Sequence, residues 1–382
     1  MSRSSVAIAL LLLLPLPGLP AAAQPPAAEP EAAPPPIAEP EPAPEARPGH
    51  RWVESIRRLV PGGGRVDVSA QGDRIAYGRG EAGTAGRRQV WVSDLDGGNL
   101  RCVTCQVYEL RKADVGNPAW HPSGSSLVVQ VQRLGGRPDP GIAGLAGPQR
   151  AVGSELWLVP LEGRQVYRLS PTEGNRTDPY FSHEADRLLW TERLRGGGAG
   201  PWGEWGVIVA QLDLKRGGIP RLGKAKTLQP GPGRGLLLAQ GFTPDDRGFL
   251  FEAGGNLYRS GFEEGEWTVV REAEGVRYGS VRPGPVAGIL AWTSDRNLPA
   301  ASAQSRLPAV SDVWLGIERD GRITEERLTF FNDPDSDHFL GEALVDDLAW
   351  SPDGDRLLLH VVSASGRQVE EGIWIVELAV TR

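Results

Sequence analysis

Short apolar strands alternate with polar turns along most of the chain, and the same order of elements recurs six times. In the clearest copy an apolar residue is followed by a polar turn and then by a second apolar strand. This copy is Trp350-Ser351-Pro352-Asp353-Gly354-Asp355-Arg356-Leu357-Leu358-Leu359. The other copies begin near Val68, Trp120, Phe181, Phe242 and Val281. A period of roughly 40 to 60 residues is typical of propellers and solenoids.

Each copy predicts four strands, as the second copy shows. Its first strand ends at Trp120, and His121-Pro122-Ser123-Gly124 forms a turn. The later strands are expected at residues 127–131, 155–160 and 166–169. Pro and Gly fix the backbone of such turns, and Ser, Asn or Asp side chains bond to it. Six copies of four antiparallel strands predict an all-β fold, a six-bladed β-propeller.

The last copy supplies only three strands, at residues 348–350, 356–362 and 373–378. An apolar segment at residues 51–60 precedes the first full copy and has no place in it. We expect this segment to form the outer strand of the last blade and to close the ring. Closure covers an otherwise open sheet edge, which is the usual liability of β proteins.

Three short runs carry a resemblance to a known family. They are Ala349-Trp350-Ser351-Pro352-Asp353-Gly354 with the strand after it, Ile373-Trp374-Ile375-Val376, and Arg327-Leu328-Thr329 at the end of a fourth strand. Together they resemble the TolB-like, WD40-like propeller repeat of bacterial periplasmic proteins, over most of residues 51–382. TolB carries an extra α/β domain before its propeller, for which this sequence has no equivalent. The resemblance therefore implies a repeat architecture and not the role of TolB.

The N-terminal region predicts export. Residues 1–23 read as a signal peptide, with Arg3, an apolar stretch at 6–14 and small residues at 21–23. The apolar stretch is too short to span a membrane. Residues 24–49 are rich in Pro, Ala and Glu and predict a disordered spacer. Residues 50–382 form the propeller domain, and we expect a periplasmic or secreted monomer.

The two cysteines, Cys102 and Cys105, lie at the end of the fourth strand of the first copy. In an exported protein they predict a local disulfide. A redox-active pair would need a neighbouring group that lowers a thiol pKa. Gln106 follows the second cysteine, so the haem-attachment motif is absent, and no second ligand pair suits zinc.

Charge and motifs exclude several functions. The net charge of −7 argues against nucleic acid or an acidic membrane surface as the main partner. The sequence has no Gly-x-Ser-x-Gly nucleophile motif. Its histidines are scattered: His121 and His183 are expected on one face of the ring and His338 on the other. We therefore predict that the chain is not an enzyme and needs no cofactor, with calcium as the one candidate.

The candidate calcium ligands are three alternating carboxylates, Asp333, Asp335 and Asp337. Carboxylate oxygens suit a hard cation such as calcium. The loop lacks the glycine of an EF-hand, and Glu342 comes two positions early for the bidentate ligand. The alternative interpretation is a solvated acidic loop.

Loop lengths point to one face of the ring as the binding face. Turns between strands one and two and between three and four are short, whereas the other loops and the crossovers are long. Long loops in compact repeats are often functional. Our candidate binding residues on this long-loop face are Asp114, Arg137, Trp202, Glu204, Trp205 and Arg296. The two tryptophans follow a Gly-rich run, and they either anchor a partner or fold back over the channel mouth.

Two classes of function follow. The first is a non-catalytic scaffold of the cell envelope that binds a protein or peptide through its long-loop face. The second is a propeller enzyme, a lyase or hydrolase acting on a polysaccharide or small ester at the channel mouth. The missing catalytic motifs, the spacer and the asymmetry of the loops favour the scaffold.

Overall fold

The structure is a computed structural model that describes residues 51–379, apart from 81–86, 133–152, 164, 171–173, 196–202, 215–218, 232–234, 264, 300–303 and 367. The expected signal peptide and spacer lie outside the described residues. Within the described ranges every regular element is a strand, and no helix is long and apolar enough to cross a membrane.

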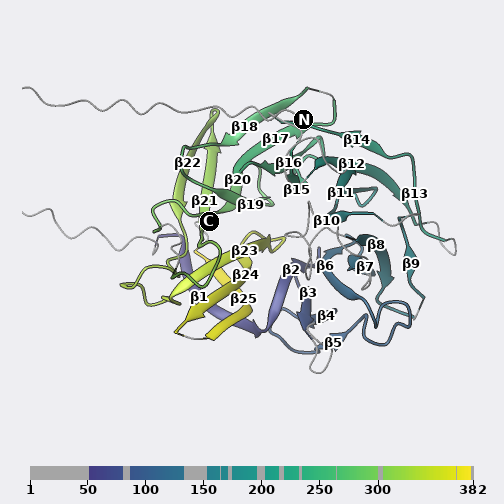
Figure 1. Cartoon of the computed structure of the whole chain (residues 1–382), viewed down its shortest axis with the longest axis horizontal. Coiled ribbons are helices and arrows are strands. Elements are labelled where there is room, and N and C mark those ends of the chain that lie inside the picture. Colours follow the sequence, from purple (N-terminus) through teal and green to yellow (C-terminus); the bar gives the residue numbers. More distant parts are fainter. Residues whose placement is uncertain are drawn as a thin grey trace, which may run out of the picture. The chain divides into compact units, whose positions relative to one another are not determined.

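Six antiparallel sheets form the propeller, one for each sequence copy (Figure 1). Blade one holds β2 (Gly63–Val68), β3 (Arg74–Gly80), β4 (Arg88–Asp94) and β5 (Arg101–Cys102). Blade two holds β6 (Asp114–Trp120), β7 (Ser126–Gln132), β8 (Ser154–Pro160) and β9 (Tyr167–Arg168). Blade three holds β10 (Arg176–Phe181), β11 (Arg187–Arg195), β12 (Glu204–Asp213), β13 (Arg221–Leu222) and β14 (Lys226–Leu228).

The remaining blades follow the same order. Blade four holds β15 (Leu237–Phe242), β16 (Gly248–Ala253), β17 (Asn256–Gly261) and β18 (Trp267–Arg271). Blade five holds β19 (Tyr278–Pro283), β20 (Ile289–Ser294), β21 (Asp312–Arg319) and β22 (Arg322–Arg327). Blade six holds β23 (Glu342–Trp350), β24 (Arg356–Ser365), β25 (Gln368–Leu378) and β1 (Val53–Pro61). The predicted fold class is confirmed.

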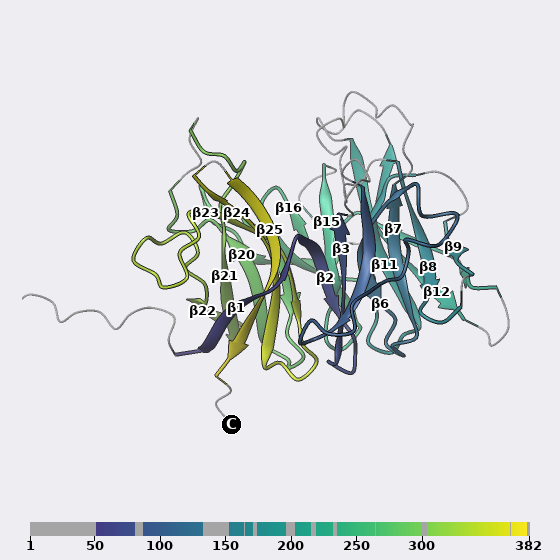
Figure 2. The same ribbon diagram turned by 90° about the horizontal axis from the view of Figure 1, so that it is seen from below.

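The first strands of the blades, β2, β6, β10, β15, β19 and β23, surround the central channel. Each contacts the first strand of the next blade, and β23 contacts β2, so the ring is complete. Seen from the side, the strands of all blades run between the same two faces (Figure 2). We call the face with the turns between strands one and two the tight-turn face.

The predicted closure strand is confirmed. β1 pairs antiparallel with β25, from Val53 opposite Leu378 to Pro61 opposite Gly372. The sheet order is therefore β1-β25-β24-β23, and the N-terminal strand completes the last blade. This pairing removes the open edge that β25 would otherwise present.

Apolar side chains fill the spaces within and between the blades. One buried cluster joins Tyr77 and Val66 of blade one to Ala349, Leu358 and Ile373 of blade six. This cluster lies where the ring closes. Burial of apolar surface between neighbouring sheets supplies the main favourable free energy of such a fold.

The fifth copy differs from the sequence expectation at its first strand. The sequence predicts that the fifth copy begins near Val281, but β19 continues to Pro283 and the turn begins at Gly284. Proline donates no backbone hydrogen bond, yet it can end a strand, and Pro283 stands opposite Leu290 in the ladder.

Every inner strand has a register shift at a corresponding place. The shifts lie between Gly63 and Val66, Gly116 and Ala119, Thr177 and Tyr180, Ala239 and Gly241, Gly279 and Arg282, and Val345 and Asp347. Asn117, Asp178 and Ser280 have positive φ at this point. Bulges re-aim side chains, and positive φ is uncommon outside glycine, so these strands are shaped to present particular residues to the channel.

Candidate functional site at the channel mouth

The site is a cavity of about 450 Å³ at the tight-turn end of the channel, lined by the inner strands of all six blades. Equivalent positions of the six copies build it in layers. We name the layers from the last residue of each inner strand, which is Val68, Trp120, Phe181, Phe242, Pro283 or Trp350.

The mouth level comprises the six residues that come immediately before the last residue of each inner strand. Its members alternate between large polar residues in blades one, three and five and small residues in blades two, four and six. They are Asp67, Ala119, Tyr180, Gly241, Arg282 and Ala349. Three small side chains leave space between three polar ones, and all six residues line the cavity.

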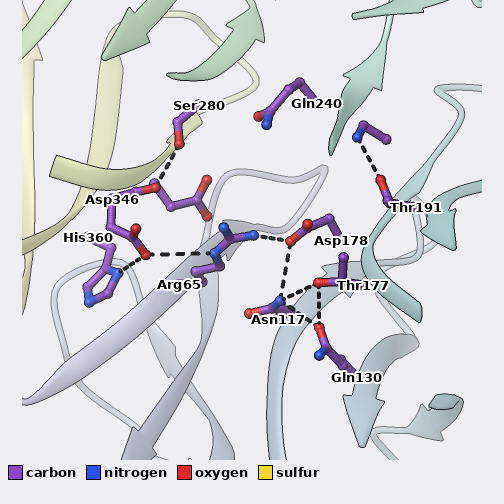
Figure 3. A network of polar contacts seen from close by, with 12 residues as sticks. Arg65, Asn117, Gln130, Thr177, Asp178, Thr191, Gln240, Ser280, Asp346 and His360 are labelled. Carbon is purple, nitrogen blue, oxygen red and sulfur yellow. Dashed lines mark hydrogen bonds and ion pairs between the residues drawn. The ribbon is translucent and has the colours of Figure 1, made fainter. Parts of the chain in front are cut away.

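The deep level lies two residues further back in each strand. It comprises Arg65, Asn117, Asp178, Ala239, Ser280 and Asp347. These residues lie at or next to the register shifts of the inner strands, and Arg65, Asn117, Asp178 and Asp347 line the same cavity as the mouth level. Figure 3 shows the polar network around the deep level, reaching from His360 and Asp346 to Gln130.

An apolar collar surrounds the cavity. The second residue after each inner strand is Ala70, Pro122, His183, Pro244, Pro285 or Pro352, and all six line the cavity. Proline has a fixed φ, so four of the six blades present a stiff apolar edge here. His183 is the exception, and its Nδ1 lies 2.8 Å from the Asp246 carboxylate.

Polar contacts link the blades around the channel. Asp67 Oδ2 accepts from the Trp120 backbone N–H at 2.7 Å, and Asn117 Nδ2 donates to Asp178 Oδ1 at 3.3 Å. The Ala239 N–H donates to Thr191 Oγ1 at 2.7 Å. Further contacts around the ring are Arg282 with Gln240 and Asp347, Ser280 with the Asp346 carbonyl, and Arg65 with Asp346. Each pair of neighbouring blades is thus joined.

The two arginines of the cavity are engaged with acids. Arg65 forms an ion pair with Asp178, whose side chain is 4% exposed, and its Nε lies 3.9 Å from Asp346. Arg282 donates to Asp347 Oδ1 at 2.6 Å and to Gln240 Oε1 at 2.7 Å. Its guanidinium also lies over the Tyr180 ring, 4.7 Å from the centroid. Both arginines therefore support the walls of the channel.

Three acids near the channel bind protons more tightly than usual, and one of them is Asp178, whose pKa burial raises although Arg65 opposes the shift. Burial raises the pKa of Asp67 to about 6, against the opposing effect of the Trp120 N–H. Burial also raises the pKa of Glu252, on β16, to about 7, with Arg65 opposing the shift. Desolvation disfavours a charged carboxylate, so Asp67 and Glu252 change charge near neutral pH.

His360 lies behind the deep level and is buried between two acids. Its Nδ1 is 3.5 Å from Asp346 and its Nε2 is 3.6 Å from Glu371, which also pairs with Arg88 of blade one at 2.8 Å. Burial lowers the pKa of His360, but the two carboxylates outweigh burial and the net shift is upwards. The imidazolium thus helps to hold blade six together near the ring closure.

The predicted binding residues do not come together at this cavity. Asp114 is buried at the start of β6 and accepts from the Arg88 backbone N–H at 2.7 Å. Glu204 accepts from Gln229 Nε2 at 2.8 Å, and Arg296 pairs with Glu325 and lies over Trp314. Arg137 and Trp202 lie outside the described residues.

Trp205 is not the exposed aromatic anchor that the sequence suggested. It lies in β12 opposite Arg193 and is fully buried in the core shared by blades three and four. The Gly-rich run before it suggested a loop, but the strand begins at Glu204. Trp205 is therefore a core residue and not a surface contact.

The three carboxylates expected to hold calcium are not gathered into a site. The Asp335 N–H donates to Asp333 Oδ1 at 3.0 Å, which forms a local turn. Within the described residues no group of three His, Cys, Asp or Glu side chains, Asp337 included, is arranged to hold a metal ion. The predicted disulfide between Cys102 and Cys105 is confirmed, with 5.7 Å between the Cα atoms.

The histidines lie as the strand assignment predicts, and one of them lines the cavity. His121 makes local contacts, with Nδ1 2.7 Å from Ser123 Oγ and its ring edge-on to Phe181. His183 belongs to the collar. The inner-strand residues Asp67, Tyr180 and Arg282 were missed, because each is a single polar residue in its own copy. An alignment of the six sequence copies on the last residue of their first strands would have revealed these three residues.

Solved structures share this architecture. TolB from Acinetobacter baumannii matches with a TM-score of 0.50 and 17% sequence identity, over 80% of this chain and 64% of that one. In fold, the chain is a TolB-like β-propeller. The alignment spans less than two thirds of the length of that TolB chain.

Other matches to the TolB-like propeller are more distant. A putative TolB from Agrobacterium tumefaciens matches with a TM-score of 0.43 and 15% identity, over 74% of this chain and 95% of that one. Oligogalacturonate lyase from Vibrio parahaemolyticus matches with a TM-score of 0.45 and 11% identity, over 82% and 76% of the two chains. No protein-family model and no curated protein matches the sequence. At such identities a shared fold does not carry a shared activity.

Proposed function

We propose that this TolB-like propeller is a non-catalytic interaction protein that binds a polypeptide segment in the cavity at its tight-turn face. The observation that carries the proposal is the layered cavity itself: equivalent positions of six blades provide an apolar collar above a charged floor. Binding pockets commonly combine apolar walls with a few polar groups that fix the orientation of the ligand.

The proposed face differs from the one that loop lengths favoured. The collar residues Pro122, Pro244 and Pro352 all lie in turns between strands one and two, so the cavity opens opposite the long-loop face. Much of the long-loop face, including residues 133–152 and 196–202, lies outside the described residues. A binding role for that face stays a prediction.

The cellular location is part of the proposal. Residues 1–23 predict a signal peptide, and Cys102 and Cys105 are bridged. Disulfides persist in oxidising compartments such as the periplasm. We place the interaction with a protein or peptide of the cell envelope.

The cavity can be tested by obstruction of its mouth. Linear peptides would be selected from a random library on the intact propeller, and their binding measured by fluorescence anisotropy. Ala70→Trp puts a large side chain on the collar, whereas Ala287→Trp changes an exposed turn residue of blade five that does not line the cavity. The proposal expects Ala70→Trp to abolish binding and Ala287→Trp to preserve it. Failure to recover any peptide, or equal binding by both variants, would contradict it.

A lyase or hydrolase acting on a polysaccharide or small ester is the second candidate. It is favoured by one observation, the raised pKa of Asp67 in a cavity that Tyr180 also lines, because a group that titrates near pH 6 can transfer protons. Turnover of polysaccharide or ester substrates that is lost in Asp67→Asn would support this candidate over the first.

A further inference from the structure

One carboxylate of the cavity lacks a cation. Asp67 accepts a hydrogen bond from the backbone N–H of Trp120 at 2.7 Å. Among the described residues no Lys, Arg or His side chain lies within ion-pairing distance of it. Arg65 and Arg282, which also line the cavity, are bound to other acids. The charge of Arg282 acts on Asp67 without an ion-pair contact, so Asp67 is the acid lining this cavity that can still gain a direct cationic partner.

The charges that line the cavity are unequal. Three carboxylates, Asp67, Asp178 and Asp347, face two guanidinium groups, Arg65 and Arg282. His183 on the collar is paired with Asp246. The excess of one carboxylate favours a cationic ligand group over an anionic one.

The walls above Asp67 suit an apolar stem. Trp350 and Phe181 are half-buried at the ends of their strands and line the cavity, and Pro122 and Pro352 extend the apolar surface towards the opening. A long side chain can lie along such a surface while its charged end reaches a polar group. Aromatic faces also attract cations.

We infer that the cavity receives a lysine side chain of the bound polypeptide, with its ammonium group on Asp67 and its methylene stem within the collar. This inference rests on the proposed function and adds the chemistry of the ligand. One oxygen of Asp67 already accepts from Trp120, which leaves single-point contact rather than the two-oxygen contact that arginine favours. Tyr180 lines the same cavity, and its hydroxyl makes no hydrogen bond to another described residue.

The raised pKa of Asp67 adds a pH dependence to this binding. Burial raises the pKa to about 6, and Arg65, Arg282, Asp178, Asp347, Tyr180 and His183 are the charged or titratable groups that line the same cavity. An ammonium binds the ionised carboxylate, so affinity is expected to fall as the pH drops below about 6.

The test begins with the peptide selection, run in parallel on the intact chain, on Asp67→Asn and on Asp320→Asn. Asp320 is an exposed turn residue of blade five, outside the cavity, and serves as the matched control. The inference expects lysine at one position in peptides selected by the wild type and by Asp320→Asn, with no such preference for Asp67→Asn. Enrichment of arginine over lysine, or of neither, would overturn it.

Calorimetry with one selected peptide then isolates the contact. Replacement of its lysine by norleucine, or of Asp67 by Asn, is expected to weaken binding by about 10- to 100-fold, the usual effect of losing a charged hydrogen bond. The two changes together should cost no more than either alone. Additive losses would overturn the inference while leaving peptide binding intact, whereas recovery of no peptide at all would refute the proposed function instead.

Discussion

Asp67 and Asp347 lie on the inner strands of neighbouring blades and line the same cavity, but their surroundings differ. Asp347 receives Arg282 at 2.6 Å, and its side chain is 6% exposed. Asp67 accepts from the Trp120 backbone N–H, has no ion-pair partner among the described residues, and its pKa is raised. The charge of Asp347 therefore helps to hold neighbouring blades together. The charge of Asp67 stays available in the cavity, and its burial lowers the stability of the fold.

The largest effect is expected for a variant that breaks the ion pair between Arg282 and Asp347. Arg282→Gln removes the partner of Asp347, two hydrogen bonds to Gln240 and the group that lies over Tyr180. We expect a loss of about 3–5 kcal/mol in the free energy of unfolding, because a buried carboxylate is left uncompensated. Chemical denaturation measures it.

Arg58→Ala is the matched control for that loss. Arg58 pairs with Glu370 at 2.9 Å and donates to the Glu371 carbonyl at 2.9 Å, and the side chains of Arg58 and Glu370 are 35% and 53% exposed. An exposed ion pair contributes at most about 1 kcal/mol. Equal losses in the two variants would show that burial does not distinguish the pairs.

A smaller effect comes from His360, behind the deep level. Its pKa is raised in the folded state, so its contribution to stability is complete below pH 6.5 and is lost as the pH rises through the folded pKa. The ionisation of Asp67, Asp178 and Glu252 also lowers the stability as the pH rises, because the pKa values of these three acids are raised in the folded state. The difference between wild type and His360→Asn isolates the histidine.

We expect that difference to be on the order of 1 kcal/mol at pH 5.5 and to shrink towards pH 8.5. Denaturation curves across this range measure it. A difference that grows with pH would mean that the neutral imidazole is the stabilising form.

The smallest effect is expected at Tyr180. Its hydroxyl makes no hydrogen bond to another described residue, whereas its ring lies under Arg282. Tyr180→Phe keeps the ring and should change the free energy of unfolding by less than about 0.5 kcal/mol. Tyr180→Ala removes the ring and should reduce the free energy of unfolding several times more. Similar losses in the two variants would contradict a hydroxyl that is available to a ligand.

The sequence was sufficient for the architecture because its signals are local. Each turn such as Ser351-Pro352-Asp353-Gly354 specifies a backbone conformation, and each apolar run next to it specifies a strand. The closure strand β1 and the disulfide also followed from short segments. Trp205 misled because glycines before a strand look like the interior of a loop.

Local sequence signals could not predict the cavity, because its lining residues lie far apart in the chain and come together only in the closed ring. Asp67, Tyr180 and Arg282 are separated by more than a hundred residues in sequence and meet only at the channel. The pairing of Arg282 with Asp347, which leaves Asp67 without a cation, depends on bulges that no composition reveals.

The most direct measurement is the free energy of unfolding at pH 7.5 of two variants that carry the same substitution, Asp67→Asn and Asp347→Asn. The account predicts opposite signs. Asp67→Asn should stabilise the chain by about 3 kcal/mol, because the pKa of the carboxylate rises from 3.8 to about 6 on folding, and this gain should vanish below about pH 4. Asp347→Asn should destabilise it, because Arg282 loses its buried partner. Loss of stability in both variants would contradict the distinction between the two carboxylates.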